Sequence, residues 1–90
     1  MDSLKTPSPP ADLSPQLTAL WYDKKGDWQQ AHMQVDHLSD RDSAWVHAYL
    51  HRKEGDTGNA DYWYRKAGKA RPAGTLDEEW EELVQYFLQN

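Results

Sequence analysis

The sequence predicts an all-α domain of five helices, arranged as two tandem antiparallel helical hairpins followed by a C-terminal capping helix. Three observations support this fold class. Apolar residues recur at helical spacing in successive segments along the chain. A capping residue, a glycine or a proline stands at the ends of these segments. No segment of useful length alternates apolar with polar residues or concentrates Val, Ile and Thr, so no strand is expected.

The chain divides into a tail and one domain. Residues 1–12 are rich in Ser and Pro and are expected to be disordered, whereas residues 13–90 are expected to form a single helical domain. The first helix begins at Ser14 and Pro15, because serine caps free amides and proline fits the first helical position. Gly26 ends this helix, since glycine accepts the left-handed conformation found at helix ends.

The second helix is expected after Asp27, whose carboxylate can cap free amides, with Gln30 placed as in a capping box. The stretch 39–43 is polar and predicts a turn. A third helix is then expected from about residue 43 to residue 54, because its apolar residues fall on one face.

Gly55 is expected to end the third helix and Asp56 to cap the fourth, which runs as far as the break at residues 71–74. Thr75 and Glu78 form a second capping box, which begins a fifth helix of about 14 residues. The acidic residues of this helix are expected on an exposed, solvating face: Asp77, Glu78, Glu79, Glu81 and Glu82.

A weak internal repeat relates the two hairpins. Residues 24–31 read KKGDWQQA and residues 53–60 read KEGDTGNA, so Lys, Gly-Asp and Ala recur at an offset of 29. In each copy glycine ends one helix, aspartate caps the next, and alanine allows the two backbones to approach closely. Two such hairpins would stack, and each would cover the apolar face of the other.

Within residues 43–73, the run SAWVHAYLHRKEGDTGNADYWYRKAGKARP resembles a tetratricopeptide-type helical repeat. The positions that carry the resemblance are Gly55, Asp56, Ala60, Tyr64, Ala67 and Pro72. The resemblance implies stacked helical hairpins and a protein–protein interaction module that binds a peptide or partner helix in a groove. The run HAYLHRKEGD, with NA and YWYR after it, also resembles a family of small bacterial proteins, which implies no particular function.

The resemblance also indicates which side chains would line the groove. They are Trp45, Tyr49, Arg52 and Lys53 on the third helix, with Tyr62 and Arg65 on the fourth. Rings and cations suit an acidic protein or peptide partner, because arginine pairs with carboxylates through two hydrogen bonds. Alternatively, the rings belong to the core and the arginines form structural ion pairs. A homodimer through exposed rings is a further alternative.

His47, His51 and Glu54 suggest an alternative function, metal binding. Their spacing of i, i+4 and i+7 places them on one face of the third helix, where they could bind zinc or another divalent ion. His32 or Asp61 could complete the ligand set. The competing interpretation is that the histidines pack against tryptophans and form hydrogen bonds with their neighbours.

Composition excludes several function classes. The 90 residues contain no cysteine, which excludes disulfides and thiolate metal sites, and the net charge of −5 argues against a nucleic-acid partner. No phosphate-binding loop or activated nucleophile is recognisable, so neither an enzyme activity nor a cofactor is expected. The N-terminus lacks the apolar stretch of a signal peptide and no run suits a membrane span, so a cytoplasmic protein without membrane contact is expected.

Overall fold

A computed structural model describes residues 8–89 of the chain, and this part contains five α-helices and no strand. The helices are α1 (Pro15–Lys24), α2 (Trp28–Val35), α3 (Arg41–Lys53), α4 (Thr57–Lys66) and α5 (Leu76–Gln89). The all-α prediction is therefore confirmed. Of the tail expected to be disordered, residues 1–7 lie outside the described part, and residues 8–12 form no helix. None of the helices in residues 8–89 has both the length and the apolar character needed to cross a membrane.

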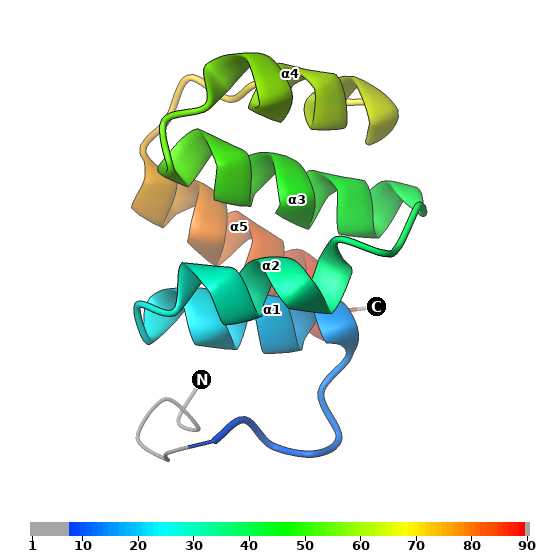
Figure 1. The fold of residues 1–90 in the computed structure, drawn as a ribbon, viewed down its shortest axis with the longest axis vertical. Helices are drawn as coiled ribbons and strands as arrows, with labels where there is room; N and C mark the ends of the chain where they lie inside the picture. The colour runs from blue at the N-terminus through cyan, green and yellow to red at the C-terminus, as the bar shows by residue number, and fades with distance from the viewer. Residues whose placement is uncertain (1–7, 90) are drawn as a thin grey trace.

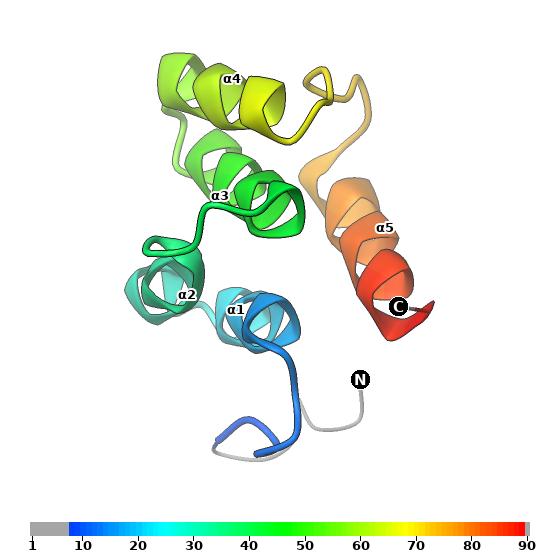
Figure 2. The same cartoon turned by 90° about the vertical axis from the view of Figure 1, so that its right-hand side faces the viewer.

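The helices form two antiparallel hairpins and a returning fifth helix (Figure 1). Helices α1 and α2 make the first hairpin, α3 and α4 make the second, and α3 packs on the first hairpin. Helix α5 runs back beside α1 and α3, on the side of the molecule opposite to α2 (Figure 2). Helix α5 therefore covers one side of α3. The opposite side of α3 lies between α2 and α4 and is not covered by α5.

The two hairpin turns have the same geometry at an offset of 29 residues. Gly26 and Gly55 both have positive φ, 88° and 90°, which glycine adopts without steric cost. The backbone amide of Asp27 donates a hydrogen bond of 2.9 Å to the Tyr22 carbonyl, and that of Asp56 donates one of 3.0 Å to the His51 carbonyl. Each bond closes a six-residue turn at the end of the preceding helix. Each aspartate also caps the next helix through its carboxylate. The Gly-Asp pairs therefore end one helix and begin the next, as the sequence predicts.

Helix α3 begins earlier than the sequence suggested. The expected start near residue 43 is wrong, because Asp40 caps the helix through a hydrogen bond of 3.0 Å from the Ser43 amide, and Arg41 is its first residue. Ser43 is instead buried inside the first turn, where its hydroxyl accepts a hydrogen bond of 2.8 Å from Gln16 of α1. The polar stretch therefore supplies a cap and a contact between α1 and α3.

The capping helix closes the core through apolar contacts and one anchored tryptophan. Trp80, Leu83 and Val84 of α5 are buried in the main core cluster. The indole nitrogen of Trp80 donates a hydrogen bond of 3.0 Å to the Leu20 carbonyl, which ties α5 to α1. Thr75 and Glu78 form the expected capping box, with hydrogen bonds of 2.8 and 3.1 Å between side chains and amides.

One acidic residue of α5 does not lie where the sequence analysis placed it. Glu79 was expected on the exposed face, but it is 3% exposed. Its position one turn after Leu76 and one turn before Leu83 puts it on the apolar face of the helix. Hydrogen bonds from neighbouring helices compensate the buried charge, as described below.

Candidate metal centre

Three histidines from two helices converge on the side of α3 that α5 leaves open. His32 comes from α2, and His47 and His51 come from α3. One ring nitrogen of each lies within 4.8 Å of those of the other two. The closest pair is the Nε2 atoms of His32 and His47, which are 2.9 Å apart. Because imidazole nitrogens are common metal ligands, we call these three residues the histidine cluster.

Local structure explains the convergence. His47 and His51 are four residues apart, so they occupy neighbouring turns on one face of α3. Helix α2 is fastened against that face by Trp28, whose indole nitrogen donates a hydrogen bond of 2.7 Å to the Leu50 carbonyl. His32 lies one turn after Trp28 on α2, and the fastening therefore brings its ring to the two rings of α3.

Two tryptophans flank the histidine cluster. Trp28 stacks on the ring of His32 with centroids 4.8 Å apart, and Trp63 of α4 stacks on the ring of His47 at 3.9 Å. Both tryptophans are only partly buried. The cluster thus has α3 as its floor and one aromatic ring from each of α2 and α4 beside it, which holds the imidazoles in place.

Carboxylates lie behind two of the imidazoles. The Nδ1 atom of His51 is 2.5 Å from a carboxylate oxygen of Glu54, and the Nδ1 atom of His32 is 3.7 Å from one of Asp36. An ionised carboxylate only accepts hydrogen bonds, so Nδ1 of His51 donates to Glu54, and in the neutral ring the lone pair is then on Nε2. This tautomer is the one that a histidine needs in order to bind a metal through Nε2.

The ring of His47 is not fully satisfied by hydrogen bonds. It is 4% exposed, and its Nδ1 atom has no hydrogen-bond partner among the described residues. Burial, followed by the neighbouring His32 and His51, lowers the pKa of His47 to about 4. Burial and then His51 also lower the pKa of His32, against the opposite effect of Asp36. Both rings are therefore neutral near pH 7 and offer lone pairs.

The ligand set that the sequence suggested is changed by one member. His47 and His51 do share a face of α3. Glu54, however, contacts Nδ1 of His51, and it groups with His51 and Asp56, not with His47. His32 takes the place that the spacing assigned to Glu54. Asp61, the other residue that could have completed the set, pairs with Arg71 at 3.5 Å.

The residues expected to line a groove on α3 mostly contact α5 and α1 instead. Trp45 is buried, and its indole nitrogen donates to Glu79 at 3.2 Å. Arg52 pairs with the same carboxylate at 2.8 Å and also donates to the Gly74 carbonyl. Arg52 therefore forms a structural ion pair, the alternative to a place in the groove, and its partner is 27 residues away on α5.

Asp23, a second buried carboxylate, binds Tyr49 and Lys53, the other two residues of α3 that were expected in the groove. Tyr49 is buried, and its hydroxyl donates a hydrogen bond of 2.7 Å to Asp23 of α1. Lys53 pairs with the other oxygen of Asp23 at 2.8 Å. Burial first, and then Asp23, raises the pKa of the Tyr49 hydroxyl, which keeps it a donor. The signal for Asp23 was its position one turn after Leu20, on the apolar stripe of α1.

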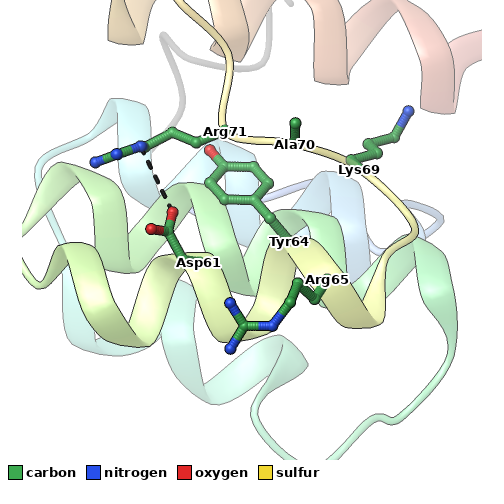
Figure 3. Close-up of a pocket in the computed structure, with 6 residues that line it drawn as sticks. All are labelled: Asp61, Tyr64, Arg65, Lys69, Ala70 and Arg71. Carbon is green, nitrogen blue, oxygen red and sulfur yellow. Dashed lines mark ion pairs between the residues drawn. The ribbon is translucent and has the colours of Figure 1, made fainter.

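Tyr62 and Arg65 of α4 are exposed members of the expected groove. Tyr62 is 45% exposed. Arg65 borders a hollow of about 310 Å³ beside α4, whose lining residues are Asp61, Tyr64, Arg65, Lys69, Ala70 and Arg71. Figure 3 shows that the side chains of Arg65 and Lys69 point away from each other. These two cations therefore do not converge on one ligand position.

Comparison with known proteins identifies no relative: no protein-family model, curated protein or solved structure matches the chain. Membership of the tetratricopeptide family accordingly stays a prediction from the sequence. The histidine cluster and the exposed face of α4 are the two features of the structure that indicate a function.

Proposed function

We propose that the protein binds a divalent transition-metal ion, with zinc as the leading candidate, through His32, His47 and His51. The observation that carries the proposal is the convergence of three ring nitrogens within 4.8 Å from two different helices. Zinc–imidazole bonds are about 2.0–2.1 Å long, so nitrogens on a tetrahedral ion lie roughly 3.3 Å apart. Small ring rotations would bring the cluster to that spacing.

The chemistry of the donors favours particular ions. Imidazole suits Zn²⁺, Cu²⁺ and Ni²⁺, whereas Mg²⁺ and Ca²⁺ prefer oxygen ligands. The carboxylate of Glu54 hydrogen-bonds Nδ1 of His51, and such partners orient metal-binding imidazoles and raise their basicity, while Asp36 lies 3.7 Å from Nδ1 of His32. The site therefore combines borderline-soft ligands with the supporting groups that accompany them in metal proteins.

Metal binding would join the two hairpins. His32 belongs to the first hairpin and the other two ligands to the second, so one ion would link α2 to α3. An ion that binds the folded chain and not the unfolded chain stabilises the fold by mass action. The proposed function is thus a metal-binding helical domain whose packing is strengthened by the ion.

Isothermal titration of zinc into the chelator-treated chain tests the proposal. One ion per chain is expected, with affinity lowered at least about tenfold in His32→Ala. The matched control is His37→Ala, because His37 is 68% exposed near the end of the same hairpin and lies outside the cluster. Absence of binding heat at micromolar protein, or equal affinities for wild type and His32→Ala, would contradict the proposal.

A second candidate function is capture of an acidic protein partner on the outer face of α4. Tyr62 is the exposed aromatic there, Lys66 lies 5.4 Å over its ring, and Arg65 is exposed on the next turn. An exposed ring beside cations offers contact area and charge pairing. This surface replaces the groove on α3, whose rings are buried.

The test is a pull-down with the double variant Tyr62→Ala, Arg65→Glu. A partner that the wild type and Thr57→Ala retain, and that the double variant loses, would support this surface. Sedimentation analysis would show whether the partner is a second copy of the chain, since a dimer would then dissociate in the double variant. Equal capture by all three proteins would exclude the α4 surface.

A further inference from the structure

We infer that the metal held by the histidine cluster keeps one coordination position open, and that this position takes a small monodentate anion with help from Asn59. This inference rests on the proposed metal binding. It names the ligand class that the site would accept, which the three histidines alone do not specify.

The histidine cluster offers three protein ligands to a metal ion. In the part of the chain that the structure describes, no fourth His, Cys, Asp or Glu joins the group formed by His32, His47 and His51. Zinc and cobalt in such sites take a fourth ligand, and where the protein supplies three, water or another exogenous ligand fills the remaining position. Three neutral imidazoles also leave the full charge of the ion uncompensated, which favours an anion.

The three histidines differ in their exposure to solvent. The side chain of His32 is 24% exposed, whereas His47 and His51 are both buried. A ligand therefore reaches the cluster from the side of His32, between α2 and α4. The rings of Trp28 and Trp63 stack on the cluster at this opening, so they restrict the position to small ligands.

A hydrogen-bond donor lies beside the histidine cluster. The side-chain amide of Asn59 on α4 lies with Nδ2 3.4 Å from Nε2 of His51. In the neutral ring of His51, Nδ1 donates to Glu54, so Nε2 is the acceptor of this contact. When a metal occupies that lone pair, the amide loses its acceptor and can donate to an anion on the ion instead.

Cobalt(II) substitution and azide titration test the inference on the full chain. Cobalt bound by the three histidines is expected to give saturable visible absorption bands, and azide is expected to shift them with a saturable dependence. Bands that stay unchanged in excess azide would overturn the open position. Absence of the bands would instead overturn the metal site itself, so the two failures are distinguishable.

Two variants test the part assigned to Asn59. Asn59→Ala should leave cobalt affinity unchanged and weaken azide binding about tenfold, the effect of losing one hydrogen bond to a charged group. Thr57→Ala is the matched control on the same exposed turn and should behave as wild type. Equal azide affinities in all three proteins would overturn the role of Asn59. A lower cobalt affinity in Asn59→Ala would overturn it as well, because the residue would then support the metal and not the anion.

Discussion

Arg52 of α3 and Glu79 of α5 form an ion pair of 2.8 Å in which the carboxylate is almost completely buried. The same carboxylate accepts hydrogen bonds from the Trp45 indole at 3.2 Å and from the Tyr64 hydroxyl at 2.6 Å. One side chain of the capping helix therefore joins α3 and α4 to α5. The arrangement satisfies the buried charge with three donors, which a buried carboxylate requires.

Removal of the carboxylate should destabilise the fold strongly. Glu79→Ala leaves Arg52 and two buried donors without their acceptor, so we expect the free energy of unfolding to fall by about 3–5 kcal/mol. Urea unfolding followed by circular dichroism measures the change. The control is Glu81→Ala on the exposed face of α5, which should stay within about 0.5 kcal/mol of wild type. Similar losses in both variants would contradict the role given to Glu79.

Trp45 should behave as a core residue. Trp45→Ala removes a buried ring that contacts α5 and is expected to cost about 3–5 kcal/mol of stability. Tyr62→Ala, at an exposed ring, should cost less than about 1 kcal/mol. Thermal unfolding of the two variants side by side measures the difference. A native melting temperature for Trp45→Ala would mean that its ring does not contribute to the core.

The stability of the metal-free chain should fall in mild acid. The pKa of His47 is about 4 in the folded chain and 6.5 in the unfolded chain, so the unfolded state takes up the proton first. The stabilising contribution is complete above pH 6.5 and is lost as the pH falls to about 4, with a total on the order of 3 kcal/mol. The charged and titratable groups that face this ring are His32, His51 and Asp36.

Urea unfolding at a series of pH values, in the presence of chelator, measures this dependence. His47→Gln removes the titrating ring, so its stability should change less than that of wild type over the same range. Carboxylates titrate in both proteins, and the difference between the two curves therefore isolates His47. Parallel curves would show that His47 does not carry the acid sensitivity.

Zinc should raise the melting temperature. At free zinc about a hundred times Kd, mass action adds about 2.7 kcal/mol, which corresponds to a shift of roughly 10 °C or more in a domain of this size. His32→Ala should lose most of this shift and His37→Ala should keep it, and excess chelator should reverse it. A shift that is equal in both variants would mean that zinc stabilises the chain through another site.

The helices and their hairpins could be predicted from the sequence because local signals bound them. Gly26 and Gly55 end helices through positive φ, and Asp27 and Asp56 cap the next ones. These effects depend on neighbours within a few residues. The start of α3 was misplaced because its polar turn contains several residues that can cap a helix, and only the contact of Ser43 with α1 distinguishes them.

The candidate site was predicted most specifically where its residues share one helix, and His32 was named only as one of two residues, with Asp61, that could complete the set. His47 and His51 follow from their spacing on α3, but His32 joins them through packing of α2, which spacing within one helix does not reveal. Glu79 was expected on the exposed face, although the positions of Glu79 and Asp23 on apolar stripes are the signal that could have indicated their burial. Their partners on other helices depend on tertiary packing.

The most direct measurement of the central claim is the zinc X-ray absorption spectrum of the chain loaded with one equivalent of the ion. The structure predicts three imidazole nitrogens at about 2.0 Å, together with one further light ligand, and loss of one imidazole in His32→Ala. A first shell of oxygen ligands with no imidazole contribution, or a spectrum unchanged in His32→Ala, would contradict metal binding by the histidine cluster.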